Sequence, residues 1–141
     1  MRNTILLALL ALLVVAMAAQ TPAAAAPARQ IDVDLAAREL VAYEGGAVVL
    51  RAPVTTGTLA HPVTPGRYGV AVKLQRATYQ VGNSTVVQPW VLDLDGGVRI
   101  MGRYYTYRWG HAPEHNTLTL PNGAAVALWN WAAVGTPVTI H

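Results

Sequence analysis

The stretch IDVDLAARELVAYEGGAVVLRAPV, residues 31–54, alternates apolar and polar side chains over much of its length. Because successive side chains of a strand point to opposite faces, this period of two predicts a half-buried strand over residues 31–35. Residues 39–43 and 47–54 flank Glu44-Gly45-Gly46, which is a typical turn signal. We therefore predict a β-hairpin over residues 39–54.

The rest of the chain continues the strand pattern. Further strands are predicted at residues 68–74, 90–94, 98–101 and 136–140. Asp95-Gly96-Gly97 separates two of them and predicts a second hairpin. The order of these segments indicates one small, mainly antiparallel sheet.

One helix is predicted, over residues 124–134. Its buried face consists of four residues at helical spacing, namely Ala125, Leu128, Trp129 and Ala132. Asn122 can cap its first turn and Gly135 can end it. The sequence thus predicts a mainly β domain with one C-terminal helix packed on the sheet.

The first 18 residues have the features of a secretory signal peptide. Arg2 provides a positive start, residues 5–17 are almost entirely apolar, and Ala16-Met17-Ala18 offers the small residues that a signal peptidase requires. The alternative is a retained anchor, but the run is shorter than the roughly 20 apolar residues that span a bilayer, so we expect no stable membrane span after cleavage. We predict export to the periplasm or cell envelope, an Ala/Pro-rich linker at residues 19–28 and one domain at residues 29–141.

Composition limits the chemistry. The chain has no cysteine, which excludes a disulfide, a thiol nucleophile and a thiolate metal site. Its formal net charge is +3, but it has no basic run and no nucleic-acid-binding motif. We therefore expect no nucleic-acid partner and interpret the charge as a mild attraction to an anionic cell wall.

Three segments, taken in order, carry a resemblance. IDVDLAARELVAYEGGAVVLRAPVTTG is similar to a first hairpin ending in Ser/Thr-Thr-Gly, HPVTPGRYGV to a Thr-Pro-x-Gly-x-aromatic turn and strand, and NGAAVALWNWAAVGTPVTI to a last helix and a Gly-Thr-Pro-Val strand. Together they resemble the L,D-transpeptidase catalytic domain, a bacterial family that forms cell-wall cross-links through an acyl-enzyme on cysteine. The resemblance covers nearly all of residues 30–140 and implies an L,D-transpeptidase-like β-sandwich or barrel.

The resemblance also assigns the family's reacting groups to positions of this chain. In the family, a His-Gly pair at a strand end precedes a Ser-His-Gly-Cys motif that contains the nucleophile. These align here with Met101-Gly102 and with residues 114–117, and the 16 positions from Met101 to Thr117 keep the family's spacing. The alignment places Thr117 where the family has its cysteine and Met101 where it has its base, whereas His115 and Gly102 are retained.

Each replacement removes part of the family's chemistry. A threonine hydroxyl stays protonated near neutral pH and needs a base, and Met101 cannot accept a proton. Asn116 replaces a glycine that lets backbone amides reach the oxyanion, and Glu114 adds a negative charge beside that place. The resemblance therefore implies a degenerate member in which the aligned positions Met101, His115, Asn116 and Thr117 do not catalyse.

Two other interpretations of this segment remain open. His111 or His115 could act as a base for Thr117, which would make the protein a threonine-dependent acyl transferase, although residues two apart in an extended segment point to opposite faces. The same two imidazoles could suggest a metal site, but Pro113 disfavours a helix there and no third ligand is close in sequence. We therefore favour structural roles for Thr117 and His115, and expect no metal and no cofactor.

Residues 103–109, Arg-Tyr-Tyr-Thr-Tyr-Arg-Trp, are the second candidate site. The equivalent segment of the family borders the peptide cleft. Four residues here, Arg103, Tyr105, Arg108 and Trp109, are suited to stacking on sugar rings and pairing with carboxylates. The alternative is that the aromatic rings cover the sheet while the arginines face water.

These patterns predict an exported cell-wall protein that binds peptidoglycan stem peptides, or another cell-wall protein, without turning them over. Two other functions stay possible. One is an active peptidoglycan acyl transferase that uses Thr117 as its nucleophile. The other is an envelope scaffold or partner subunit that does not contact peptidoglycan.

Overall fold

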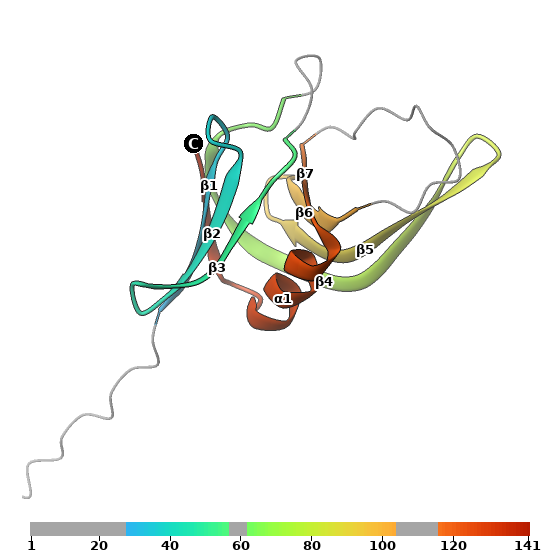
Figure 1. Cartoon of the computed structure of the whole chain (residues 1–141). Coiled ribbons are helices and arrows are strands. Elements are labelled where there is room, and N and C mark those ends of the chain that lie inside the picture. The colour runs from blue at the N-terminus through green and yellow to red at the C-terminus, as the bar shows by residue number, and fades with distance from the viewer. Residues whose placement is uncertain (1–27, 57–61, 104–115) are drawn as a thin grey trace, which may run out of the picture.

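The computed structural model of the chain describes residues 28–56, 62–103 and 116–141. These residues form eight strands and one helix (Figure 1). The strands lie in one sheet in the order β3-β2-β1-β8-β4-β5-β6-β7. Their bounds are β1 (Arg29–Asp34), β2 (Glu39–Glu44), β3 (Ala47–Pro53), β4 (Gly66–Val81), β5 (Ser84–Leu94), β6 (Arg99–Gly102), β7 (Thr117–Leu120) and β8 (Pro137–Ile140), and the helix is α1 (Asn122–Trp131).

The sheet folds back on itself around one core. Its first half contains β3, β2, β1, β8 and the start of β4, and its second half contains the rest of β4 with β5, β6 and β7. In the described part of the chain, the two edge strands come together at a single bridge between Thr55 and Thr119. The mainly β fold with one C-terminal helix is confirmed, and because β3 and β7 do not pair along their length, the sheet is a sandwich and not a closed barrel.

The predicted alternation is confirmed in β1. Ile31 and Val33 are buried in the core, whereas Asp32 and Asp34 are half-buried on the other face. The predicted hairpin over residues 39–54 is also present, as β2 and β3. Its turn contains Gly45 and Gly46 at φ of 59° and 81°, a left-handed conformation that glycine adopts without steric cost.

The hairpin of β4 and β5 is longer than predicted. The sequence predicts strands at residues 68–74 and 90–94, whereas β4 continues to Val81 and β5 already begins at Ser84. The apolar alternation fails in the middle of β5 because Trp90 follows Pro89 and has a left-handed φ of 53°. Beyond this point the two strands form an arm that projects from the body of the molecule (Figure 1).

The predicted bounds of the helix are wrong at both ends. Asn122 is the first residue of α1 and its side chain does not cap the helix. The helix ends at Trp131 and not at Val134, because Ala132 is already extended with φ −67° and ψ 140°. Gly135, with φ of 91°, serves the turn that leads into β8 and does not end the helix.

Two cations from distant strands hold the C-terminal end of α1. The last turn of the helix has no basic residue of its own. Instead, Lys73 Nζ donates to the carbonyl of Ala132 at 2.5 Å, and Arg29 Nη1 donates to the carbonyl of Trp131 at 2.9 Å. Positive charge at this end of a helix offsets the negative end of its dipole.

The predicted buried face of the helix is confirmed in part. Ala125, Leu128 and Ala132 are buried, but Trp129 is only half-buried against the core. Its ring lies at 5.6 Å from Trp90 in an edge-to-face arrangement, and Lys73 Nζ lies 4.5 Å from its centroid. Trp129 therefore joins the helix to both β4 and β5.

Residues 1–27, which contain the predicted signal peptide and most of the predicted linker, lie outside the described part of the chain. In the described part, no helix combines the length and the apolar composition needed to cross a bilayer.

Candidate functional site

Three neighbouring strands carry the predicted catalytic positions on one face. Asp93 of β5 pairs with Arg99 of β6, and Arg99 pairs in turn with Thr117 of β7. Residues that pair directly point to the same face of a sheet, so these three form one row, and Met101 and Thr119 form the next row. We call this surface of β5–β7 the site face; it comprises Asp93, Arg99, Met101, Thr117 and Thr119.

The opposite surface of the same strands faces the core. Its members alternate in sequence with those of the site face and are all buried, namely Leu92, Leu94, Ile100, Leu118 and Leu120. This core face packs against α1 and fixes the three strands. Each site-face side chain is therefore held in place because its neighbours in the strand are buried in the core.

The structure brings the predicted base and nucleophile positions together. Met101 and Thr117 lie on adjacent strands, two residues apart in register, with exposed fractions of 0% and 2%. A thioether cannot accept a proton, so Met101 gives the hydroxyl of Thr117 no base at the position that the resemblance predicts for it. A substrate carbonyl would also have to reach a hydroxyl that is almost completely shielded from solvent.

The site face holds an ion pair that the sequence analysis did not identify. Arg99 donates from Nε and Nη2 to the two carboxylate oxygens of Asp93, at 2.5 and 3.0 Å, and from Nη1 to Oε1 of the buried Gln88. The Arg99 and Asp93 side chains are 27% and 30% exposed. This bidentate pair fixes a guanidinium in the same row as Thr117.

A signal for this pair was present in the sequence. Asp93 and Arg99 are each three residues from Gly96, the middle of the predicted turn Asp95-Gly96-Gly97. A hairpin about that turn places the two side chains opposite each other, and opposite charges directly across a pair of strands attract.

Asn116 occupies the place that the resemblance assigns to a glycine. Its φ is 53°, in the left-handed region that glycine favours and asparagine tolerates. Its Oδ1 accepts hydrogen bonds from the backbone N–H and the hydroxyl of Thr64, at 3.2 and 3.3 Å. The backbone therefore suits a glycine, while the side chain ties the start of β7 to the turn that precedes β4.

Gly102 is required by a neighbouring side chain. A Cβ at this position would lie 2.7 Å from Oδ1 of Asn122 and 3.1 Å from Cγ of Pro89. The same Oδ1 accepts a hydrogen bond from the backbone N–H of Arg103 at 2.8 Å. Asn122 thus sets the direction in which the chain leaves β6, and Arg103 is exposed at that point.

The other predicted site residues lie outside the described part of the chain. These are His115 of the aligned motif and Tyr105, Arg108 and Trp109 of the aromatic segment, together with His111 and Glu114. Within residues 28–56, 62–103 and 116–141, no three His, Cys, Asp or Glu side chains are grouped closely enough to hold a metal ion.

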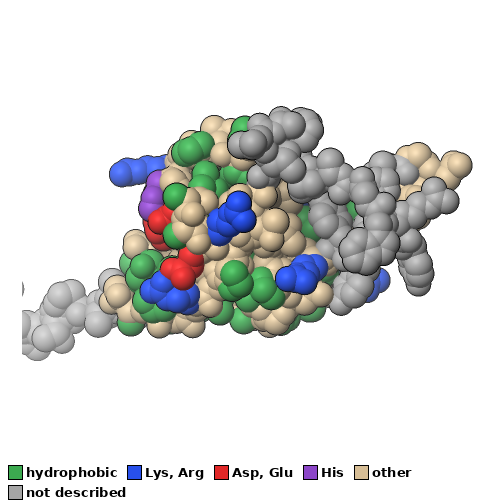
Figure 2. Space-filling model, turned by 45° about the horizontal axis from the view of Figure 1, so that its top comes forward, with side chains coloured by type: hydrophobic (Ala, Val, Ile, Leu, Met, Phe, Trp, Pro, Cys, Tyr) green, Lys and Arg blue, Asp and Glu red, His purple; other side chains and the backbone are tan. Residues whose placement is uncertain are grey.

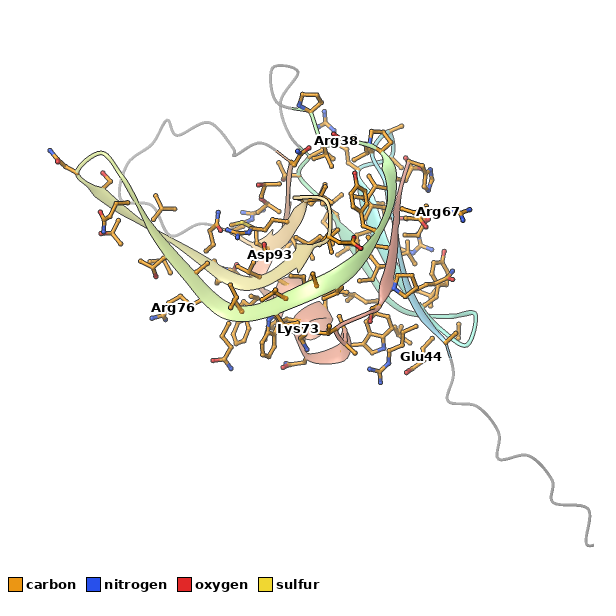
Figure 3. All side chains as sticks on the ribbon, turned by 180° about the vertical axis from the view of Figure 1, so that it is seen from behind. Arg38, Glu44, Arg67, Lys73, Arg76 and Asp93 are labelled. Atoms are coloured by element: carbon orange, nitrogen blue, oxygen red, sulfur yellow. The ribbon has the colours of Figure 1, made fainter. Side chains whose placement is uncertain are left out.

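Charged side chains are dispersed over the described surface. Figure 2 shows Lys and Arg side chains that stand apart from one another on the face in view. Arg38, Arg67 and Arg76 likewise point away from the body at separate places (Figure 3). No continuous basic stripe is formed on these views of the described residues.

Among the described residues, two ionisable groups have clearly shifted pKa values, and neither belongs to the site face. A hydrogen bond from Arg29 lowers the pKa of the Glu44 carboxyl. A hydrogen bond to Asp32 raises the pKa of the His141 imidazole, whose Nε2 lies 3.0 Å from Oδ2 of Asp32. His141 is therefore half of an exposed ion pair when protonated.

Solved L,D-transpeptidase structures are similar to this fold. A point mutant of the Enterococcus faecium enzyme has a TM-score of 0.69 and 23% identity, covering 81% of this chain and 50% of that one. L,D-transpeptidase 1 of Mycobacterium tuberculosis has a TM-score of 0.67 and 15% identity, covering 81% of this chain and 62% of that one. The Stackebrandtia nassauensis enzyme has a TM-score of 0.66 and 20% identity, covering 86% of this chain and 58% of that one. This chain thus spans between 50% and 62% of the length of these three structures.

A family-level comparison gives the assignment. Comparison with curated protein sequences gave no match. Residues 28–140 match the YkuD family, the L,D-transpeptidase catalytic domain. This range contains all eight strands and the helix. The chain therefore belongs to the L,D-transpeptidase catalytic domain family.

Proposed function

We propose that the exported domain binds peptidoglycan stem peptides, or another cell-wall protein, and does not turn them over. Membership of the L,D-transpeptidase family relates the chain to the cell wall. The observation that carries the proposal is the pair of Met101 and Thr117 on the site face, where the family has its base and its nucleophile. A buried thioether beside a buried hydroxyl cannot perform the family's acyl transfer, and the chain has no cysteine elsewhere.

The surroundings of Thr117 support the same conclusion. Its row continues with Arg99, whose guanidinium cannot act as a base because it stays protonated in proteins. The carboxylate of Asp93 could accept a proton, but it lies beyond Arg99 in the row and already receives two hydrogen bonds from that guanidinium. The threonine-dependent transferase is therefore the weaker alternative.

Intact-mass spectrometry tests the absence of catalysis. The purified mature domain is incubated with a tetrapeptide donor or a carbapenem, and no covalent adduct is expected because neither a thiolate nor an activated hydroxyl is available. Thr117→Ala serves as the control. A stable adduct on Thr117 that disappears in Thr117→Ala would establish the transferase alternative.

Stepwise restoration tests whether the site has lost its reacting groups. Thr117→Cys alone should react little, because Met101 still cannot take the proton. Adding Met101→His should raise the rate of adduct formation, and adding Asn116→Gly should raise it again by freeing backbone amides for the oxyanion. The last change also removes the bonds to Thr64, so the melting temperature of each variant must be measured beside its rate.

Binding of a defined muropeptide separates the remaining functions. By calorimetry, Arg103→Ala, Arg108→Ala and Trp109→Ala should each weaken binding, since these side chains are suited to carboxylates and sugar rings. Thr117→Ala should leave it unchanged. A folded wild-type domain that binds no muropeptide would instead support the envelope scaffold.

A further inference from the structure

The projecting arm has a free edge. β8 pairs with β4 only from Gly66 to Gly69, and the last backbone bonds on that side join Val70 to Gly135 and Thr136. From residue 71 to Val81, β4 pairs only with β5 among the described residues. Figures 1 and 3 show no strand on the outer side of this part of β4. A row of backbone N–H and C=O groups is therefore open to pairing with another chain.

Exposed apolar side chains lie beside this edge. Val72 and Leu74 are 46% and 37% exposed, and they share one face because they are two residues apart in a strand. Their cross-strand partners are Asp93 and Val91, so this is the side of the sheet that carries the site face. A strand added next to β4 would remove part of both side chains from water.

The arm is also positively charged. Residues 72–92 contain Lys73 and Arg76 but no Asp or Glu. Lys73 turns towards α1, where it donates to Ala132 (Figure 3). Arg76 points away from the body, and it has no acidic partner in the described part of the chain (Figure 3). The available charge of this edge is therefore complementary to a carboxylate.

The edge of β3 differs in this respect. It also exposes valines, with Val48 and Val49 at 50% and 46%. Its arginine, however, is neutralised, because Arg51 forms an ion pair with Glu39 of β2. An acidic partner would gain an unpaired cation on β4 but not on β3.

We propose that the free edge of β4 in the arm binds an extended, acidic segment of another protein by strand addition. Backbone hydrogen bonds would provide the pairing, Val72 and Leu74 would contact alternate apolar side chains, and Arg76 would pair with a carboxylate. This interaction uses a surface separate from Thr117 and does not depend on the function proposed for the site face.

One backbone position allows pairing with an added strand to be tested without disturbing the rest of the fold. The two-residue turn Gly82-Asn83 joins Val81 and Ser84, which in such a hairpin form a hydrogen-bonded pair. Bonding alternates along antiparallel strands, so the N–H of Thr78 points to the free edge and not to β5. Thr78→Pro thus removes a donor for an added strand and keeps the bonds within the arm.

The test uses the whole mature domain, labelled with nitrogen-15, and a synthetic ten-residue peptide that alternates valine or threonine with glutamate. Amide shifts on titration should concentrate between Leu74 and Val81. Thr78→Pro should weaken binding at least about tenfold, and Arg76→Glu should make the lysine version of the peptide the better ligand. Val49→Thr on β3, which keeps that edge without an added charge, is the matched control and should bind like wild type.

Several outcomes would overturn the proposal. These are shifts that concentrate on β3, equal affinity for the lysine peptide, unchanged binding by a folded Thr78→Pro variant, or no shift at millimolar peptide. Sedimentation that shows a dimer lost in Thr78→Pro would likewise overturn it, because the occupant of the edge would then be a second copy of the chain.

Discussion

The core face and the site face of β5, β6 and β7 consist of alternate residues of the same short segments, yet they differ in composition, because only the core face is entirely apolar. The core face remains wholly apolar and buried, as the packing of α1 demands. The site face has methionine and threonine at the positions that the resemblance predicts for the family's reacting groups. Because alternate side chains of a strand are on opposite sides, one surface can lose its chemistry while the other preserves the fold.

The charged side chains at the site face nevertheless have hydrogen-bond partners. Arg99, Asp93 and Gln88 satisfy one another, and Asn116 satisfies Thr64. A partly buried charge without a partner costs free energy, so the pairing of Arg99 with Asp93 and Gln88 stabilises this face. We therefore expect the site face to contribute to stability, but less than the core face does. Four measurements test this difference.

The largest expected difference is between two adjacent residues of β7. Leu118→Ala, on the core face, should lower the free energy of unfolding by about 2–5 kcal/mol because it leaves a cavity in a packed core. Thr117→Ala, on the site face, should cost only about 1 kcal/mol, the typical worth of one polar interaction. Urea unfolding measures both, and equal costs would contradict the division into two faces.

Gly102 should be the most sensitive position at the boundary of the site face. Gly102→Ala places a methyl group within 2.7 Å of Oδ1 of Asn122. The resulting shift should cost about 1–3 kcal/mol. Asn122→Ala should cost less in the Gly102→Ala background than in the wild type. A melting temperature unchanged by Gly102→Ala would show that the contact is not tight.

The ion pair of Arg99 and Asp93 should contribute less to the free energy of unfolding. Arg99→Met leaves Asp93 half-buried without its partner, which should cost about 1–2 kcal/mol after allowance for its partial exposure. The exposed pair of Arg51 and Glu39 is the control, and Arg51→Met should cost under about 0.5 kcal/mol. Similar costs in chemical denaturation would mean that the site face is not a stabilising network.

The smallest effect is expected at the exposed pair of His141 and Asp32, away from both faces. Because the folded pKa of His141 is raised above its ordinary 6.5, the stabilisation is complete below that ordinary value and is lost as the pH rises through the folded pKa. An NMR titration should show the raised pKa of His141 and its return towards 6.5 in Asp32→Asn. A titration unaffected by Asp32→Asn would show that the two side chains do not form an ion pair in solution.

The turns of the short hairpins could be predicted from the sequence, whereas most side-chain partners could not. Gly45-Gly46 and Gly96-Gly97 marked both short hairpins because left-handed backbone favours glycine. The bend at Trp90 was missed because such a φ is rare for a bulky residue, and its edge-to-face contact with Trp129 involves a residue 39 positions away. The sequence predicted Asn122 as a helix cap from its place before the helix. Its actual partner, the backbone N–H of Arg103, could not be predicted because no local pattern relates the two segments.

The sequence by itself determined most of the strand pattern, the C-terminal helix and the absence of a thiol, because each depends on residue type and short-range spacing; the replacement of the family's base and nucleophile stays a prediction. Only the tertiary structure decided that Asp93, Arg99 and Thr117 share one row, that Asn116 holds Thr64, and that β4 leaves an edge free. These relations depend on strand register and on contacts between residues far apart in the chain. Pairing and burial set them, and neither is a property of any single segment.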